Sequence, residues 1–162
     1  MGELVILCVE DEPEVRAALV RDLEPFAAVA RVDAAADAAD ARAAIADLLA
    51  DGDQLALVLA DHRMPGGSGT DLLVAVHADP ATARARTVLV TGQAGLGDTI
   101  RAVNEAGLDH YVAKPWSADA LHAVVRRLLT DYVLEARIDP LRFMRYLDAE
   151  RLLAAYRDHG DE

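Results

Sequence analysis

Polar side chains that could do chemistry stand directly at or after the ends of short apolar runs. Glu10 and Asp11 follow one such run, Asp61 follows another, Thr91 ends a third and Lys114 follows a fourth. Clustered carboxylates repel one another unless a cation neutralises them, and their oxygens suit Mg²⁺. A carboxylate such as that of Asp61 can attack phosphorus and form an acyl phosphate. Taken singly, such residues are often solvated loop or strand positions, so the interpretation depends on their being brought together.

The segments between these residues predict how they are positioned. Nearly continuous apolar runs predict short buried strands, and helical spacing separates them, which favours a doubly wound α/β fold with a parallel sheet and helices on both faces. Functional groups then gather at the carboxyl ends of the strands. The predicted strands are residues 4–9, 28–32, 55–60, 87–91 and 109–113, and the predicted helices are residues 12–23, 38–49, 71–77, 99–106 and 117–137.

The pattern changes after about residue 137. Asp139 followed by Pro140 is a good helix start, and the stretch 141–156 mixes apolar and charged residues. We expect one or two additional helices there. The predicted organisation is a domain at 1–130 and an extension of the last helix with a helical tail at 131–162.

Composition narrows the class of protein further. The 162 residues carry a formal net charge of -12, so unaided binding to nucleic acid or to an anionic membrane is not expected. The lone Cys8 excludes an internal disulfide bond, and neither a signal peptide nor a spanning segment is recognisable. These features predict a soluble, cytoplasmic protein.

Taken as a set, these motifs resemble the receiver domain of two-component response regulators, a flavodoxin-like fold. The resemblance covers roughly residues 3–129, with every motif in the right order and spacing. Its motifs are Val9-Glu10-Asp11, Ala60-Asp61-His62-Arg63-Met64-Pro65 with Gly69, Val90-Thr91-Gly92 and Tyr111-Val112-Ala113-Lys114-Pro115.

The resemblance implies a role for each acidic residue. Asp61 would accept the phosphoryl group from a phosphohistidine of a sensor histidine kinase or phosphotransfer protein. Asp11 and Asp61 would bind Mg²⁺ (or Mn²⁺) through carboxylate oxygens, Arg63 through its backbone carbonyl, and Glu10 through water. The chain would be a signalling module that catalyses only its own phosphorylation and dephosphorylation, not an enzyme acting on other substrates.

The resemblance also implies a switch. Thr91 would move toward the phosphoryl group while Tyr111 turns inward, which would rearrange the face made by the fourth helix, fifth strand and fifth helix. Lys114 would bridge to the acyl phosphate, and the Lys114–Pro115 peptide bond would be cis. The glycines of the loop at 92–97 would give the backbone the freedom to move.

Two alternatives remain at this stage. An aspartate-nucleophile phosphatase of the haloacid-dehalogenase type needs a second acid two residues after the nucleophile, and Arg63 stands there. The other alternative concerns output. The chain is either a single-domain regulator, with an unidentified downstream partner and a homodimer formed through the responding face or the C-terminal helix, or the receiver part of a longer regulator.

Overall fold

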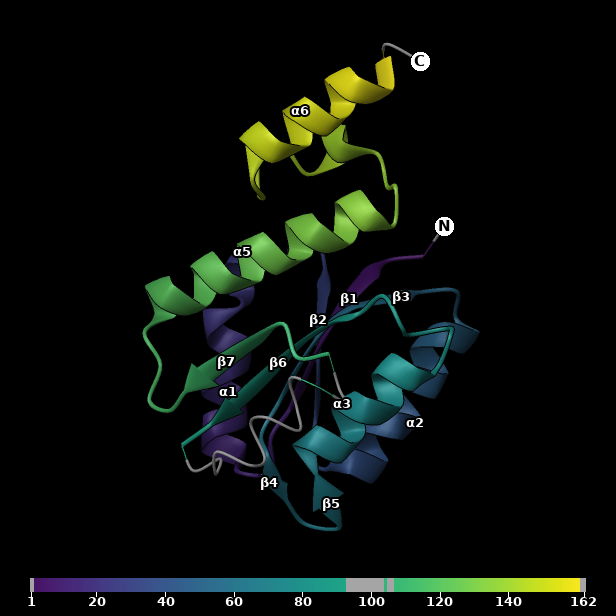
Figure 1. The fold of residues 1–162 in the computed structure, drawn as a ribbon. Helices are drawn as coiled ribbons and strands as arrows, with labels where there is room; N and C mark the ends of the chain where they lie inside the picture. Colours follow the sequence, from purple (N-terminus) through teal and green to yellow (C-terminus); the bar gives the residue numbers. More distant parts are fainter. Residues whose placement is uncertain (1, 93–103, 105–106, 161–162) are drawn as a thin grey trace.

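A computed structural model describes residues 2–92, 104 and 107–160 of the chain. The helix predicted at 99–106, apart from Asn104, and the loop glycines Gly95 and Gly97 lie outside the described residues. Figure 1 shows the order of the elements. They are β1 (Leu4–Val9), α1 (Pro13–Asp22), η1 (Glu24–Phe26), β2 (Arg31–Ala35), α2 (Ala38–Ala50), β3 (Gln54–Ala60), β4 (Arg63–Met64), β5 (Gly67–Ser68), α3 (Gly69–Ala78), β6 (Arg86–Thr91), β7 (His110–Ala113), α5 (Ala118–Glu135), η2 (Pro140–Arg142) and α6 (Ala149–Gly160).

The main sheet has five strands in the order β2-β1-β3-β6-β7, and every neighbouring pair is parallel. The predicted doubly wound fold is therefore confirmed. β1 and β3 lie at the centre, and all their residues except Gln54 are buried. This is why both read as continuous apolar runs in the sequence.

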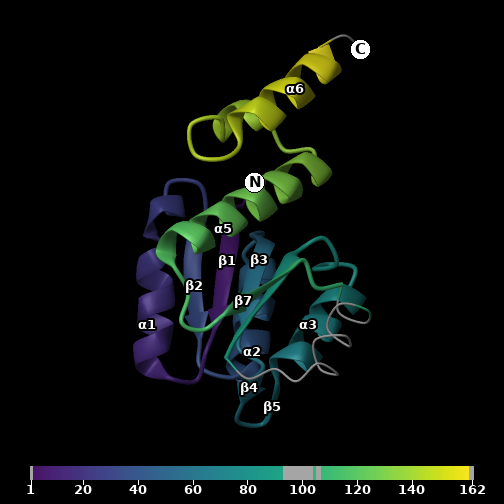
Figure 2. The same cartoon turned by 60° about the vertical axis from the view of Figure 1, so that its left-hand side comes forward.

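Helices cover both faces of this sheet (Figure 2). On one face, α1 and α5 pack over side chains such as Ile6 and Leu57, and this core contains most of the large apolar residues. On the other face, α2 and α3 pack over Leu7 and Val58. In β1, alternate residues thus enter different cores, so a register shift of one residue would exchange them.

Side-chain caps place the starts of three helices. Asp37, Ser68 and Ser117 accept hydrogen bonds from backbone N–H groups in the first turns of α2, α3 and α5. Each cap satisfies a donor that has no partner within its own helix. The starts of α2 and α5 were predicted to within one residue of these caps.

The position predicted for the second strand is wrong. The strand begins at Arg31 rather than at residue 28, because the backbone of Val29 and Ala30 turns back to hydrogen-bond Phe26. The sequence from 27 to 36 is mostly alanine, which favours neither a strand nor a face. Pairing of Arg31 with Val5 sets the register instead.

A small antiparallel hairpin, β4–β5, follows β3 and was not predicted. Its turn has Pro65 at the second position and Gly66 at the third, with φ of 77° at Gly66. That sequence and backbone angle are those of a type II turn, in which the third residue needs a positive φ.

The C-terminal tail, residues 138–160, folds back onto α5 on the side away from the sheet (Figures 1 and 2). It contains η2 and α6, in agreement with the prediction of one or two extra helices. Phe143, Leu147 and Leu152 are buried and belong to the same apolar cluster as the buried side chains of α5. The tail therefore packs as part of the same molecule.

Candidate functional site

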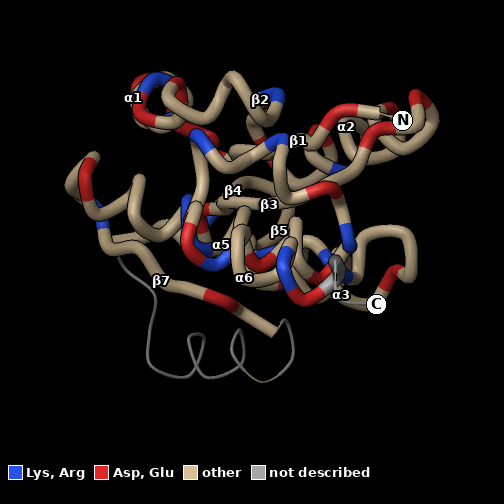
Figure 3. Tube along the Cα trace, turned by 90° about the horizontal axis from the view of Figure 1, so that it is seen from above, with Lys and Arg blue, Asp and Glu red and all other residues tan. Residues whose placement is uncertain are grey.

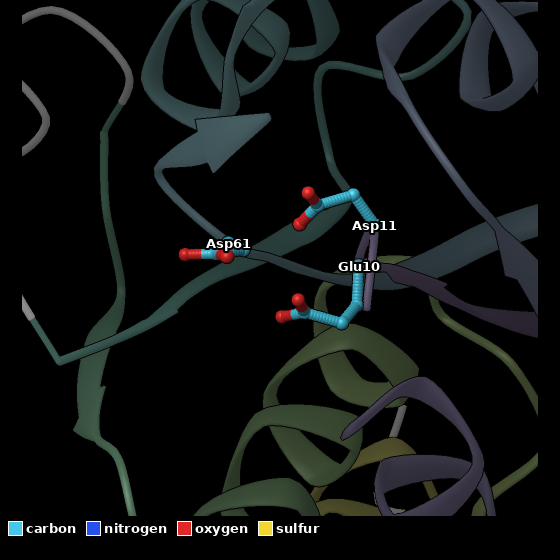
Figure 4. Close-up of side chains that lie close together, drawn as sticks. All are labelled: Glu10, Asp11 and Asp61. Carbon is cyan, nitrogen blue, oxygen red and sulfur yellow. The ribbon is translucent and has the colours of Figure 1, made fainter. Parts of the chain in front are cut away.

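Three carboxylates meet at the carboxyl ends of β1 and β3, the two central strands. Glu10 and Asp11 come directly after β1, and Asp61 comes directly after β3. One carboxylate oxygen from each lies within 4.8 Å of the others, and Figure 4 shows the three side chains turned toward a common space. The Asp61 N–H donates to the carbonyl of Val9 at 3.0 Å, which continues the pairing of the strands to the site itself.

Lys114 is the cation of this cluster. Its Nζ lies 2.7 Å from Oε2 of Glu10 and 3.2 Å from Oδ2 of Asp61. Burial disfavours the ammonium form, but hydrogen bonds and the charges of Glu10 and Asp61 outweigh it, so the pKa of Lys114 is raised. Lysine at this position is therefore charged at neutral pH.

One ammonium does not offset the burial of these carboxylates. Glu10 is 1% exposed and Asp61 is 7% exposed. Burial raises the pKa of Glu10, and the charge of Asp61 adds to this, although hydrogen bonds from Lys114 and the Glu12 N–H act in the opposite direction. The site therefore favours a further positive charge.

Arg16 also contacts the cluster, and sequence reasoning did not identify it. Its guanidinium donates to the backbone carbonyl of Glu10 at 2.9 Å, from the first turns of α1. The Glu12 N–H donates to Oε1 of Glu10 at 3.2 Å. These bonds hold Glu10 in place, and the only signal in the sequence was an arginine one helical turn into α1.

The β4–β5 hairpin and the start of α3 also border Asp61. The Arg63 N–H points toward Oδ1 of Asp61 at 3.4 Å, and the Gly69 N–H donates to the carbonyl of His62 at 2.9 Å. The ring of His62 is hydrogen-bonded to the buried hydroxyl of Thr70 at 3.0 Å. The turn after Asp61 is thereby fixed at several points.

Thr91 and Tyr111 lie on the neighbouring strands β6 and β7. Thr91 ends β6 and is buried, and the Tyr111 hydroxyl donates to its backbone carbonyl at 2.9 Å. Tyr111 is partly buried against the core that α2 and α3 cover. The two residues predicted as a switch pair are therefore in direct contact.

The loop that carries Lys114 is anchored to α1. The Lys114–Pro115 peptide bond is cis. The indole N–H of Trp116 donates to Oδ2 of Asp22 at 2.9 Å, and the ring of His122 contacts the carbonyl of Asp22. Sequence reasoning missed these contacts, because nothing local to Trp116 indicates which helix end it will meet.

The family model for the response regulator receiver domain matches residues 6–126, so the chain belongs to this family. It is a receiver domain of two-component signalling, and its acidic cluster is typical of the Mg²⁺ site of such domains.

Individual relatives agree with this assignment. The chain is 32% identical over 133 residues to the hydrogenase transcriptional regulatory protein HoxA of Bradyrhizobium diazoefficiens, covering 80% of this chain and 25% of that protein. It is 33% identical over 124 residues to the response regulator Rre1 of Synechocystis sp., covering 76% of this chain and 51% of that protein. The chain thus spans about a quarter to a half of the length of these relatives.

Among solved structures, the chain resembles a CheY-like response regulator receiver domain protein from Methanospirillum hungatei. The TM-score is 0.70 at 28% identity, over 83% of this chain and 99% of that one. Within the described residues, no helix is long and apolar enough to cross a membrane.

Proposed function

We propose that this receiver domain accepts a phosphoryl group on Asp61 from a phosphohistidine of a sensor histidine kinase or a phosphotransfer protein. The observation that carries this proposal is the position of Asp61: it shares one pocket with Glu10 and Asp11, and its carboxylate lies 3.2 Å from the Lys114 ammonium. A carboxylate oxygen of Asp61 attacks phosphorus, the P–N bond to the donor imidazole breaks, and an acyl phosphate forms.

A divalent cation fits the donor set. Among the described residues, the three carboxylates have one ammonium as an ion-pair partner, so an excess of negative charge is left to be neutralised. We infer that Asp11 and Asp61 bind Mg²⁺ (or Mn²⁺) through carboxylate oxygens, Arg63 through its backbone carbonyl and Glu10 through water. When bound, the cation offsets charge on the transferring phosphoryl group. Lys114, which lies 3.2 Å from Asp61, would pair with the same group.

The conformational response to phosphorylation follows from the contact between Thr91 and Tyr111. The Thr91 hydroxyl donates to the phosphoryl group, and the segment it belongs to moves with it. Because the Tyr111 hydroxyl is bonded to the Thr91 carbonyl, displacement of Thr91 changes the position that Tyr111 prefers. Phosphorylation shifts the equilibrium only as far as the phosphoryl group interacts better with one arrangement of Thr91 and Tyr111 than with the other. Some basal activity of the unphosphorylated protein is therefore expected.

Residues 1–130 act as the receiver unit in this proposal, and residues 131–162 extend it. The chain covers a quarter of a protein named as a transcriptional regulator, which supports the idea that related receivers operate within longer regulators. The downstream partner of this chain is therefore a protein surface, either on the same polypeptide or on a separate one.

The proposal is tested by labelling with radioactive acetyl phosphate in the presence of Mg²⁺. Asp61→Asn should reduce incorporation to background, because the amide is no nucleophile, and EDTA should do the same for the wild-type protein. Asp51→Asn, at the exposed end of α2, is the matched control and should label normally. Wild-type labelling of Asp61→Asn would show that Asp61 is not the acceptor.

A further inference from the structure

The C-terminal tail carries every large apolar side chain that is exposed in the described part of the chain. Leu153 is 39% exposed and Tyr156 is 47% exposed, both on α6, and Leu141 is 50% exposed on η2. Elsewhere in the described residues, side chains of this size are buried or partly buried. An exposed apolar surface concentrated in one segment of the chain indicates a binding partner.

α6 cannot turn to bury this surface, because its other face is fixed to α5. The Arg151 guanidinium pairs with Asp131 of α5 at 2.6 Å, and the Asp148 N–H donates to the Thr130 hydroxyl at 3.2 Å. Leu152 is fully buried in the apolar cluster that also contains the buried side chains of α5. The orientation of α6 about its own axis is thus determined.

The exposed residues form a stripe along α6, which we define as Ala149, Leu153 and Tyr156. They follow one another at spacings of four and three, the pattern of a helix that packs against a second helix. All three are exposed. The stripe is therefore a short seam without a partner in the described structure.

Two opposite charges border the seam on its outer side. Glu150 and Arg157 are both exposed and lie two helical turns apart, about 10 Å along the axis, so they cannot pair with each other. Neither forms an ion pair with any other described residue. Figure 3 looks down on this end of the molecule, where acidic and basic positions occur along the same helix.

We propose that the seam binds the α6 seam of a second copy of this chain, with the two helices antiparallel about a two-fold axis. In that arrangement Leu153 of each copy packs against Tyr156 of the other. Glu150 of each copy meets Arg157 of the other, so the same ion pair forms twice. Two parallel α6 helices would instead place Glu150 opposite Glu150 and Arg157 opposite Arg157, so no ion pair would form.

The interface is small, so association is weak and depends on concentration. Three side chains per copy bury less than a standard interface does, so the dimer forms only as the concentration of the chain rises. The seam lies at the other end of the molecule from the acidic cluster (Figure 1). Dimerisation is therefore independent of the phosphoryl group and goes beyond the proposed function.

Sedimentation velocity of the full chain, from low to high micromolar concentration at physiological ionic strength, tests the proposal, because salt screens the general repulsion between copies that each carry a net charge of -12. Wild type should shift from monomer to dimer, and Leu153→Asp should remain monomeric throughout. Ala154→Asp is the matched control, because Ala154 is exposed outside the seam, and it should dimerise like wild type. Unchanged thermal unfolding of Leu153→Asp at low concentration verifies that this variant is folded.

Charge reversal tests the antiparallel arrangement. Glu150→Arg alone and Arg157→Glu alone should each weaken association roughly tenfold, because both symmetric pairs become repulsive. A mixture of these two single variants should form heterodimers with wild-type affinity, and so should the double variant with itself.

Several outcomes would overturn the proposal. They are a wild-type monomer at all concentrations, a dimer that survives Leu153→Asp, and single variants that fail to restore association when mixed. A dimer that forms only with beryllofluoride would also overturn it, since the contact would then lie on the face that responds to phosphorylation.

Discussion

The position of Asp61 depends on Gly69, a residue that carries no functional group. A Cβ atom on Gly69 would lie 2.0 Å from the backbone carbonyl oxygen of Asp61, a distance that no real contact allows. The obstacle is backbone rather than a flexible side chain, so the turn between β3 and α3 would have to move. The close approach explains why glycine starts α3 directly after the cap Ser68.

Gly69→Ala is therefore expected to displace Asp61. We predict a loss of about 1–3 kcal/mol in the free energy of unfolding, measured by urea denaturation, as for other overpacked sites. Labelling by acetyl phosphate should fall at least roughly tenfold, because small displacements of a reacting group are costly.

Gly67→Ala is the matched control in the same hairpin. Its Cβ would meet only the Ala38 methyl group, at an ordinary 3.6 Å, so stability and labelling should both stay close to wild type. Equal effects of the two substitutions would contradict the argument from the carbonyl of Asp61.

At the scale of the elements, helix α5 ends in a backbone conformation that favours glycine, but the residue at that position is arginine. Arg137 has φ of 56°, in the left-handed region. The Ile138 N–H donates to the Val133 carbonyl and the Arg137 N–H to the Leu134 carbonyl, which is a Schellman motif. Val133 is buried in the apolar cluster and the partly buried Ile138 packs against it, so the motif fixes where the tail begins.

Arg137→Gly should stabilise the protein by about 0.5–1 kcal/mol, because glycine adopts this backbone conformation without the cost of a Cβ. Thermal unfolding should show a rise of about 1–4 °C for a chain of this size. Arg137→Ala keeps the Cβ and removes the charge, so it should leave the melting temperature nearly unchanged. A gain from alanine equal to that from glycine would assign the effect to charge instead.

The elements also show what the sequence can and cannot predict. β1 and β3 were placed well because burial on both faces produces an unbroken apolar run. β2 was misplaced because a run of alanine marks neither a face nor an end, and pairing with β1 decides its register. The β4–β5 hairpin has two residues per strand, too few for any periodicity.

The same limits apply to the site. The meeting of Glu10, Asp11 and Asp61 required only the order of the strands and the rule that functional groups collect at their carboxyl ends. The contacts of Arg16 with Glu10 and of Trp116 with Asp22 join side chains from separate elements, so they depend on how α1 packs. No local pattern encodes that packing.

For the molecule as a whole, the question is how it tolerates its negative charge. The formal net charge is -12, and the carboxylates of Glu10, Asp11 and Asp61 are concentrated at one end of the sheet. General repulsion among surface charges responds to any salt, whereas a site with oxygen ligands responds to a divalent cation specifically. The two contributions can be separated by comparing Mg²⁺ with NaCl at equal ionic strength.

Mg²⁺ should raise the melting temperature well beyond the matched NaCl solution. A ligand at a hundred times its dissociation constant stabilises by about 2.7 kcal/mol, which corresponds to roughly 5–10 °C here.

Asp11→Asn and the wild-type protein should exchange their order of stability when Mg²⁺ is added. Without Mg²⁺ this variant should be more stable than wild type by about 1 kcal/mol, because one repulsive charge is gone. With Mg²⁺ it should be the less stable protein, because a ligand is gone. Asp51→Asn removes the same charge away from the cluster and should keep the full response to Mg²⁺. If Asp11→Asn kept the full response to Mg²⁺ too, Asp11 would not be a metal ligand, and the other proposed ligands would hold the cation without it.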